Sequence, residues 1–138
     1  MLKLMYITNS PEVASIADGA GVDRIFIDLE QYGKEKRQKN WDSVKSKHSI
    51  SDIPKVKSAV KNAQIFVRTD PIFDGFSDEL EGVLACEPDV VMLPYFKTVR
   101  EVETFIKAVD GRATTSLLLE TREAAEQIDD IISVGGID

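Results

Sequence analysis

The chain has 138 residues, of which 43% are hydrophobic and 30% are charged, a balance typical of one globular domain rather than of a disordered or fibrous protein. It carries 17 Lys and Arg against 24 Asp and Glu, and the net charge of -7 argues against general affinity for nucleic acid or anionic membranes, which are polyanions. A single cysteine, Cys86, excludes an internal disulfide, and no apolar run approaches the roughly 20 residues of a membrane helix, so we expect a cytoplasmic protein.

Short β-rich runs alternate with amphipathic helical stretches along the whole chain. Ser10 followed by Pro11 is typical of a helix start, and Gly21 is typical of a helix end. Ser77 and Thr98 are expected to cap two later helices. The expected strands cover residues 2–7, 24–30, 64–69, 89–94 and 113–119, and the expected helices cover residues 11–20, 50–62, 77–86, 99–110 and 122–133. This pattern predicts five consecutive βα units, and therefore an α/β fold in one domain.

The second and fourth expected strands have nearly continuous apolar cores, which is typical of parallel strands that are buried on both faces. Two architectures can be built from five such units. One is a complete, flavodoxin-like doubly wound sheet, which the length of the chain favours. The other is an incomplete TIM (β/α)8 barrel, whose full form typically needs about 250 residues. The chemistry at the ends of the strands favours the barrel.

The connection after the second strand, residues 31–49, is unusually long and polar, and connections of this length are often functional. Tyr32 and Trp41 within it either close over a ligand or anchor the loop. His48, the single histidine of the chain, is a candidate general base near neutral pH. Its simpler interpretation is a residue at the entry to the following helix.

Charged residues stand where the expected parallel strands end, which is the edge at which such folds bind ligands. Asp28 and Glu30 end the second strand, Arg68 ends the third and Glu120 follows the fifth. The planar fork of an arginine suits a carboxylate, and clustered carboxylates suit a hard cation such as Mg²⁺ or Mn²⁺. Taken singly, Arg68 could also form a surface salt bridge, and Glu120 could stabilise the start of a helix.

Several common signatures are absent from the sequence. It contains no GxxxxGK[ST], GxGxxG, HExxH or GxSxG motif. Cys86 has no CxxC partner and is expected to be a buried small hydrophobic residue rather than a nucleophile. The first strand also ends without the acidic residues that a phosphorelay receiver module needs, which weakens the flavodoxin-like alternative.

The strand ends together resemble the HpcH/HpaI aldolase and citrate lyase family, whose members are (β/α)8 barrels of the phosphoenolpyruvate/pyruvate type. Each matching motif is short, but their order and spacing agree with the family along essentially the whole chain. The segments that carry the resemblance are residues 21–30, 67–68, 89–94 and 119–124, together with residues 134–138.

The resemblance implies a metal-dependent carbon–carbon lyase or aldolase that acts on a pyruvate-like 2-oxo acid, or a related small carboxylic acid, through an enolate. It implies that Glu120 binds Mg²⁺ or Mn²⁺ and that Arg68 contacts the substrate and stabilises the enolate. Asp28 and Glu30 would be the acid pair beside it, with Asp28 in substrate binding and Glu30 as a catalytic residue that orders water or the arginine. Whether a CoA thioester is involved is left open. Gln31 stands where many aldolases of the family have a histidine, so their base is in doubt here, and His48 is the substitute candidate.

In the family, the second metal-binding acid follows strand six, and the resemblance places residues 134–138 just before that strand. We therefore expect residues 1–138 to form five βα units of a barrel that is truncated before strand six. The open sheet edges should drive homo-oligomerisation, and the 138-residue chain should have negligible lyase activity. The alternatives are a complete flavodoxin-like binding or regulatory module and a catalytically inactive, oligomeric interaction protein.

Overall fold

The computed structural model describes residues 2–31 and 47–138, so the expectations for Tyr32 and Trp41 lie outside the described residues. The strands are β1 (Met5–Ile7), β2 (Arg24–Asp28), β3 (Gln64–Arg68), β4 (Val90–Leu93) and β5 (Thr114–Leu117). The helices are α1 (Pro11–Gly19), α3 (Asp52–Ala59), α4 (Phe76–Leu84), α5 (Val99–Val109), α6 (Arg122–Ala125) and α7 (Ile128–Ile132). None of these helices is long and apolar enough to cross a membrane.

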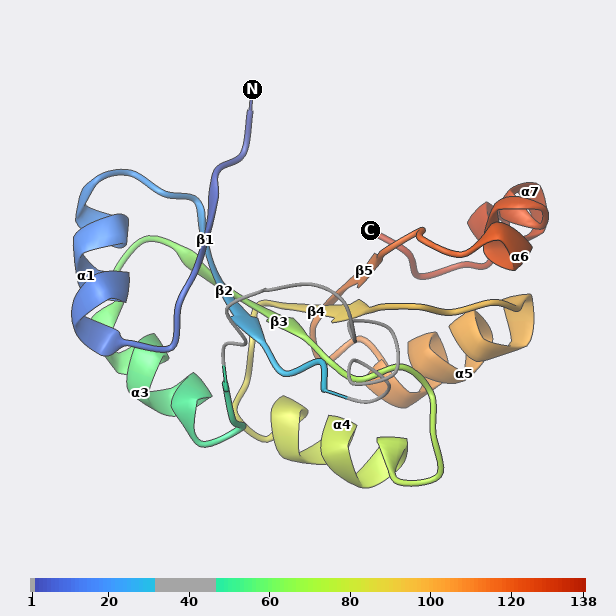
Figure 1. Cartoon of the computed structure of the whole chain (residues 1–138), viewed down its shortest axis with the longest axis horizontal. Helices are drawn as coiled ribbons and strands as arrows, with labels where there is room; N and C mark the ends of the chain where they lie inside the picture. The colour runs from blue at the N-terminus through green and yellow to red at the C-terminus, as the bar shows by residue number, and fades with distance from the viewer. Residues whose placement is uncertain (1, 32–46) are drawn as a thin grey trace, which may run out of the picture.

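All five strands are parallel and lie in the sheet in the order β1-β2-β3-β4-β5. Figure 1 shows the helices following one another in an arc around the outside of this sheet. A doubly wound sheet would instead reverse its strand order and carry helices on both faces. The sequential order therefore contradicts the flavodoxin-like alternative and agrees with part of a (β/α)8 barrel, within which the described strands form an open sheet.

The two faces of the sheet are packed differently. On the outer face, aliphatic strand residues form one continuous core with the helices; its fully buried strand members include Ile25, Ile27, Val67 and Val91. On the inner face, Phe26, Phe66 and Val90 form a separate small cluster to which no described helix contributes. Successive residues of a strand point to opposite faces, so each central strand contributes to both.

Local sequence explains both ends of α1 and the start of α5. The Ser10 hydroxyl accepts the Val13 N–H, as expected for a cap, and Gly21 lies at φ 88° after α1. Thr98 and Glu101 form a reciprocal capping box at the start of α5. These contacts satisfy backbone N–H groups that a helix start leaves unpaired.

Two helix predictions are corrected. Gly75, not Ser77, is the N-cap of α4, because the helix begins at Phe76, one residue before Ser77. Glycine has no side chain, so this helix start has no side-chain capping bond. The helix expected at 122–133 is two short helices, α6 and α7, with Gln127 at φ -114° between them. Residues 122–133 contain no glycine or proline, so the sequence does not predict a break at Gln127.

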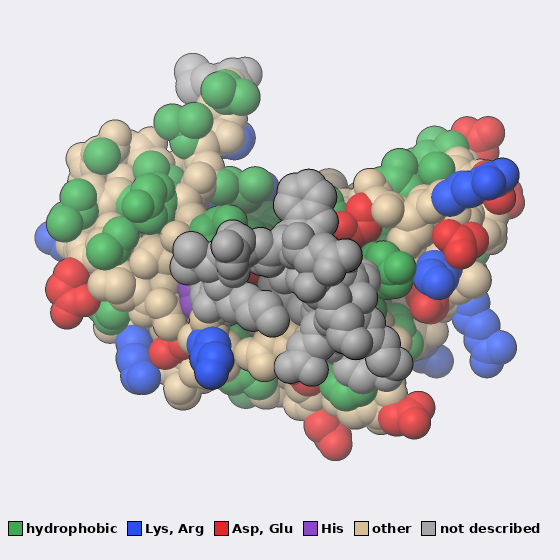
Figure 2. All heavy atoms as spheres, viewed as in Figure 1, with side chains coloured by type: hydrophobic (Ala, Val, Ile, Leu, Met, Phe, Trp, Pro, Cys, Tyr) green, Lys and Arg blue, Asp and Glu red, His purple; other side chains and the backbone are tan. Residues whose placement is uncertain are grey.

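The edge strand β1 is exposed. Its three residues, Met5, Tyr6 and Ile7, are each about half accessible to solvent at 51%, 48% and 53%. Leu4 before the strand and Ile16 on the neighbouring helix α1 are also exposed. Figure 2 shows apolar side chains gathered over this part of the molecule.

Candidate functional site

The carboxyl ends of β2 and β3 carry an ion pair. Asp28 and Arg68 are direct neighbours in the strand register and point to the inner face of the sheet. Arg68 Nε donates to Asp28 Oδ1 at 2.9 Å, and Arg68 Nη2 donates to Asp28 Oδ2 at 2.8 Å. This two-point contact fixes the plane of the guanidinium.

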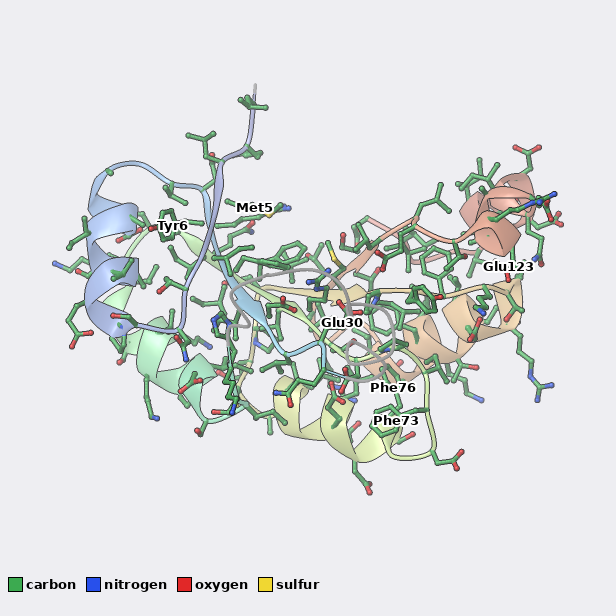
Figure 3. The ribbon with its side chains drawn as sticks, in the orientation of Figure 1. Met5, Tyr6, Glu30, Phe73, Phe76 and Glu123 are labelled. Atoms are coloured by element: carbon green, nitrogen blue, oxygen red, sulfur yellow. The ribbon has the colours of Figure 1, made fainter. Side chains whose placement is uncertain are left out.

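Glu30 completes an acid pair around the same arginine. Its Oε2 lies 3.3 Å from Arg68 Nη1, and its side chain is 5% exposed. The Glu30 N–H also donates to Asp28 Oδ1 at 3.2 Å, which ties the turn after β2 to the carboxylate before it. Figure 3 shows Glu30 over the middle of the sheet, where the strands β2, β3 and β4 run close to one another.

Burial and three carboxylates act on the charge of Arg68. Burial opposes its charge, but its hydrogen bonds to Asp28 and the negative charges of Asp28, Glu30 and Glu120 outweigh burial and raise the pKa of Arg68 above its ordinary value. The guanidinium therefore stays charged, and it lies 5.7 Å from the centre of the Phe26 ring. Among the described residues, three carboxylates therefore act on this one guanidinium.

Glu120 lies beyond β5 and is exposed to solvent. Its Oε1 accepts the Tyr95 N–H at 3.0 Å, and Tyr95 itself has the left-handed φ of 49° that directs this amide. Its other oxygen, Oε2, accepts no hydrogen bond from the described residues. An exposed carboxylate of this kind fits a hard divalent cation as one ligand. Residues 2–31 and 47–138 contain no group of three His, Cys, Asp or Glu side chains that could hold a metal together.

His48 contacts the end of β2 and Gln31 shortly after it. It is only 4% exposed, and its Nδ1 accepts the backbone N–H of Asp28 at 2.9 Å. Its backbone carbonyl accepts the Gln31 side-chain amide at 3.2 Å. While the first contact holds, Nδ1 cannot take a proton from a substrate.

A second pair of acids lies behind this turn. Glu79 on α4 accepts the Asp70 N–H at 2.9 Å, and Asp70 accepts the Gln31 N–H at 2.6 Å. Burial and the neighbouring Asp70 charge raise the pKa of Glu79 to about 7, against the hydrogen bond from Asp70 that lowers it. Both acids, with His48 and Gln31, line a cavity of about 220 Å³.

A larger hollow, about 740 Å³, lies at the opposite ends of the strands. The Asp18 carboxylate in its wall accepts the N–H groups of Lys61, Asn62 and Ala63. The hydrogen bonds from Lys61 and Ala63 lower the pKa of Asp18. In barrel folds the amino-terminal ends of the strands serve stability. We therefore place the candidate functional site at the carboxyl ends of the strands, beside Arg68.

The structure brings together the residues that the sequence placed on one rim. Asp28, Glu30 and Arg68 are in direct contact, and Glu120 is near enough to raise the arginine's pKa. Sequence reasoning missed Glu79. The signal was its spacing, because it falls three residues after Phe76 on the apolar stripe of α4.

Comparison with solved structures finds the same fold. An HpcH/HpaI aldolase from Desulfitobacterium hafniense DCB-2 matches with 15% identity and a TM-score of 0.72 over 99% of this chain and 60% of that chain. A family protein from Burkholderia cenocepacia J2315 matches with 12% identity and a TM-score of 0.77, covering 99% and 61%. A citrate synthase, SbnG, matches with 16% identity and a TM-score of 0.71, covering 99% and 58%. The chain thus spans about three fifths of these proteins.

Comparison with curated protein sequences found no match. The sequence does match the protein family described as HpcH/HpaI aldolase/citrate lyase, and the match extends over residues 3–138. This is nearly the whole chain, and it includes Asp28, Glu30, Arg68 and Glu120. The chain belongs to the HpcH/HpaI aldolase/citrate lyase family.

Proposed function

We propose that the protein is a carbon–carbon lyase of the aldolase type, which acts on a pyruvate-like 2-oxo acid or a related small carboxylic acid through an enolate. The observation that carries this proposal is the fixed Arg68 guanidinium at the carboxyl end of β3, held by Asp28 and Glu30. A positive group held in place before reaction stabilises negative charge that develops on a substrate oxygen.

Arg68 keeps donors for a ligand. A guanidinium has five N–H groups. Two of these donate to Asp28 and one faces Glu30, so two remain, one each on Nη1 and Nη2. The side chain is 18% exposed, which leaves part of it accessible. In this proposal, these two N–H groups bind the carboxylate or the enolate oxygen of the substrate.

The exposed carboxylate of Glu120 is the reason that a cation belongs to the proposal. We propose that Mg²⁺ or Mn²⁺ is bound with Glu120 as one of its ligands. Such an ion, when bound, adds positive charge that polarises the substrate carbonyl. Asp28 and Glu30 bind Arg68, so Glu120 is the one carboxylate of this set that we propose as a cation ligand. We therefore expect negligible turnover by the 138-residue chain, and binding is the informative measurement.

The test is calorimetric titration with oxalate, which has the planar shape and negative charge of a pyruvate enolate. We expect binding in millimolar Mg²⁺ and weaker binding without it. Arg68→Lys should weaken binding by at least about tenfold, because an ammonium cannot replace the two-point fork. Arg112 makes a similar two-point contact with Glu81 on the surface, so Arg112→Lys is the matched control and should leave oxalate binding unchanged. No oxalate binding, or equal binding by Arg68→Lys and wild type, would contradict the proposal.

We also propose that the chain self-associates through the apolar surface at its first strand. β1 is an edge strand, and an edge strand presents unpaired backbone groups to another chain. Leu2, Leu4 and the three residues of β1 are all exposed there. An apolar edge of this kind is a typical site of association.

A further inference from the structure

Strand β2 continues past the end of its neighbour β1. The last contact between the two is the Thr8 N–H donating to the Phe26 carbonyl at 3.2 Å, and β1 has already ended at Ile7. On the other side of β2, the Leu29 N–H donates to the Arg68 carbonyl. Because N–H groups alternate sides along a strand, the Asp28 N–H points toward the side where β1 is missing.

The imidazole of His48 takes the place of the missing strand. Its Nδ1 accepts the Asp28 N–H at 2.9 Å, although His48 lies 20 residues after Asp28 in the chain. With an exposure of 4%, the ring excludes water from this contact. A buried N–H without an acceptor is costly, so the position of the Asp28 backbone depends on this nitrogen.

We infer that His48 is a positioning residue whose neutral imidazole, protonated on Nε2, holds Asp28 and through it Arg68 in place. The inference rests on the proposed function, because it concerns the same anion site. Two contacts carry the effect onward. The Asp28 carboxylate receives two hydrogen bonds from Arg68, and it also accepts the Glu30 N–H. A shift of the Asp28 backbone therefore moves the acid that sets the plane of the guanidinium.

The chemistry of the ring defines the state that is needed. A neutral imidazole has one donor and one acceptor nitrogen, whereas an imidazolium has two donors. Nδ1 can accept from Asp28 only if it carries no proton, so the proton of the neutral ring is on Nε2. In this role Nδ1 is occupied by the Asp28 N–H and is not available to act as the general base that was one of the two interpretations of His48.

The first test needs no variant and no ligand. Nitrogen NMR of the single histidine reports which ring nitrogen carries the proton. In wild-type protein at pH 7.5 we expect an unprotonated Nδ1 and a protonated Nε2. A proton on Nδ1 would overturn the inference. Since this measurement does not involve oxalate, its outcome is separate from that of the proposed function.

The second test compares two variants that differ in where they place an acceptor. The side-chain oxygen of His48→Asn lies close to the position of Nδ1, and that of His48→Gln lies close to Nε2. We expect His48→Asn to keep the Arg68 Nε–H resonance and oxalate binding near those of wild type. His48→Gln should shift that resonance and bind oxalate about tenfold more weakly, as expected when a buried donor loses its partner.

A purely structural role gives a different pattern. It would lower the unfolding midpoint of both variants while the Arg68 Nε–H resonance stayed in place. That result, or an equal loss of the resonance in both variants, would overturn the inference. If wild-type protein failed to bind oxalate, the proposed function would fall, while the resonance and the ring tautomer would still decide the role of His48.

Discussion

The outer and inner faces of the same sheet meet different demands. Outer residues such as Ile27 and Val67 are fully buried between the strands and the helices, and they have no polar atoms in their side chains. The inner face carries aromatic side chains in the middle of the strands, where the ring centroids of Phe26 and Phe66 lie 5.1 Å apart. At the carboxyl ends of the same strands it carries the Asp28–Arg68 ion pair. Ile27 therefore faces the helices, and Asp28, the next residue of β2, faces the inner side of the sheet and binds Arg68.

This difference follows from the two-residue period of a strand, which lets one segment serve two faces. Burial of apolar area gives the outer face its stabilising role. A buried ion pair contributes little net stability, because desolvation of the charges offsets their attraction. The inner rim is therefore expected to affect ligand binding more than folding, and the outer face the reverse.

The largest expected effect is on the outer face. Ile27→Ala removes a side chain that is 0% exposed and leaves a cavity beneath the helices. We expect the free energy of unfolding to fall by about 2–5 kcal/mol, measured by urea denaturation. Ile16→Ala on α1, where the side chain is 73% exposed, is the control and should change stability by less than about 0.5 kcal/mol. Similar losses for the two variants would contradict the assignment of the core to the outer face.

The next effect is a pH dependence of stability at the cavity that Glu79 and Asp70 line. The pKa of Glu79 is raised from 4.5 to about 7, so the folded chain holds a proton that the unfolded chain releases between these values. The cost of ionising Glu79 is absent below pH 4.5, grows as the pH rises, and is complete above pH 7. Because the group is only partly buried, this cost is roughly 1–2 kcal/mol after allowance for solvent screening.

Glu79→Gln should remove that cost, because the amide resembles the protonated acid and its oxygen can still accept the Asp70 N–H. Relative to wild type, the variant should gain stability between pH 5 and pH 8, as followed by urea denaturation at both values. Glu81 lies on the same helix, but its hydrogen bonds with Arg112 lower its pKa. Glu81→Gln should therefore gain nothing as the pH rises, and an equal gain in the two variants would contradict the role given to Asp70 and Glu79.

The fold could be predicted largely from sequence because its signals are local. Caps such as Ser10 and Thr98 mark helix starts directly, and the parallel strands follow from their apolar cores. The meeting of Asp28 with Arg68 followed from a general rule that the carboxyl ends of parallel strands share one edge. Both features need only short stretches of chain and one topological rule.

Other features depend on contacts between distant residues. The role of His48 requires that β1 end beside Phe26, two residues before Asp28, and residues 2–7 give the end of the first strand but not its register against the second. The raised pKa of Glu79 requires that α4 place it against Asp70. Neither feature can be predicted from the neighbouring residues, because both depend on how the helices and strands pack together.

The smallest effect on stability is expected at the sheet edge, where self-association would change most. Ile7 is 53% exposed, so Ile7→Lys should alter the free energy of unfolding by less than about 1 kcal/mol. A charge on an edge strand opposes pairing with another strand, so the variant should be monomeric in size-exclusion chromatography with light scattering, whereas wild type should form oligomers. Ile132→Lys on α7, at a site that is 67% exposed, is the control and should keep the wild-type size. A monomeric wild type would exclude the edge as an interface. The exposed side chains of β1 would then differ from those of the buried central strands only in contributing less to the free energy of unfolding.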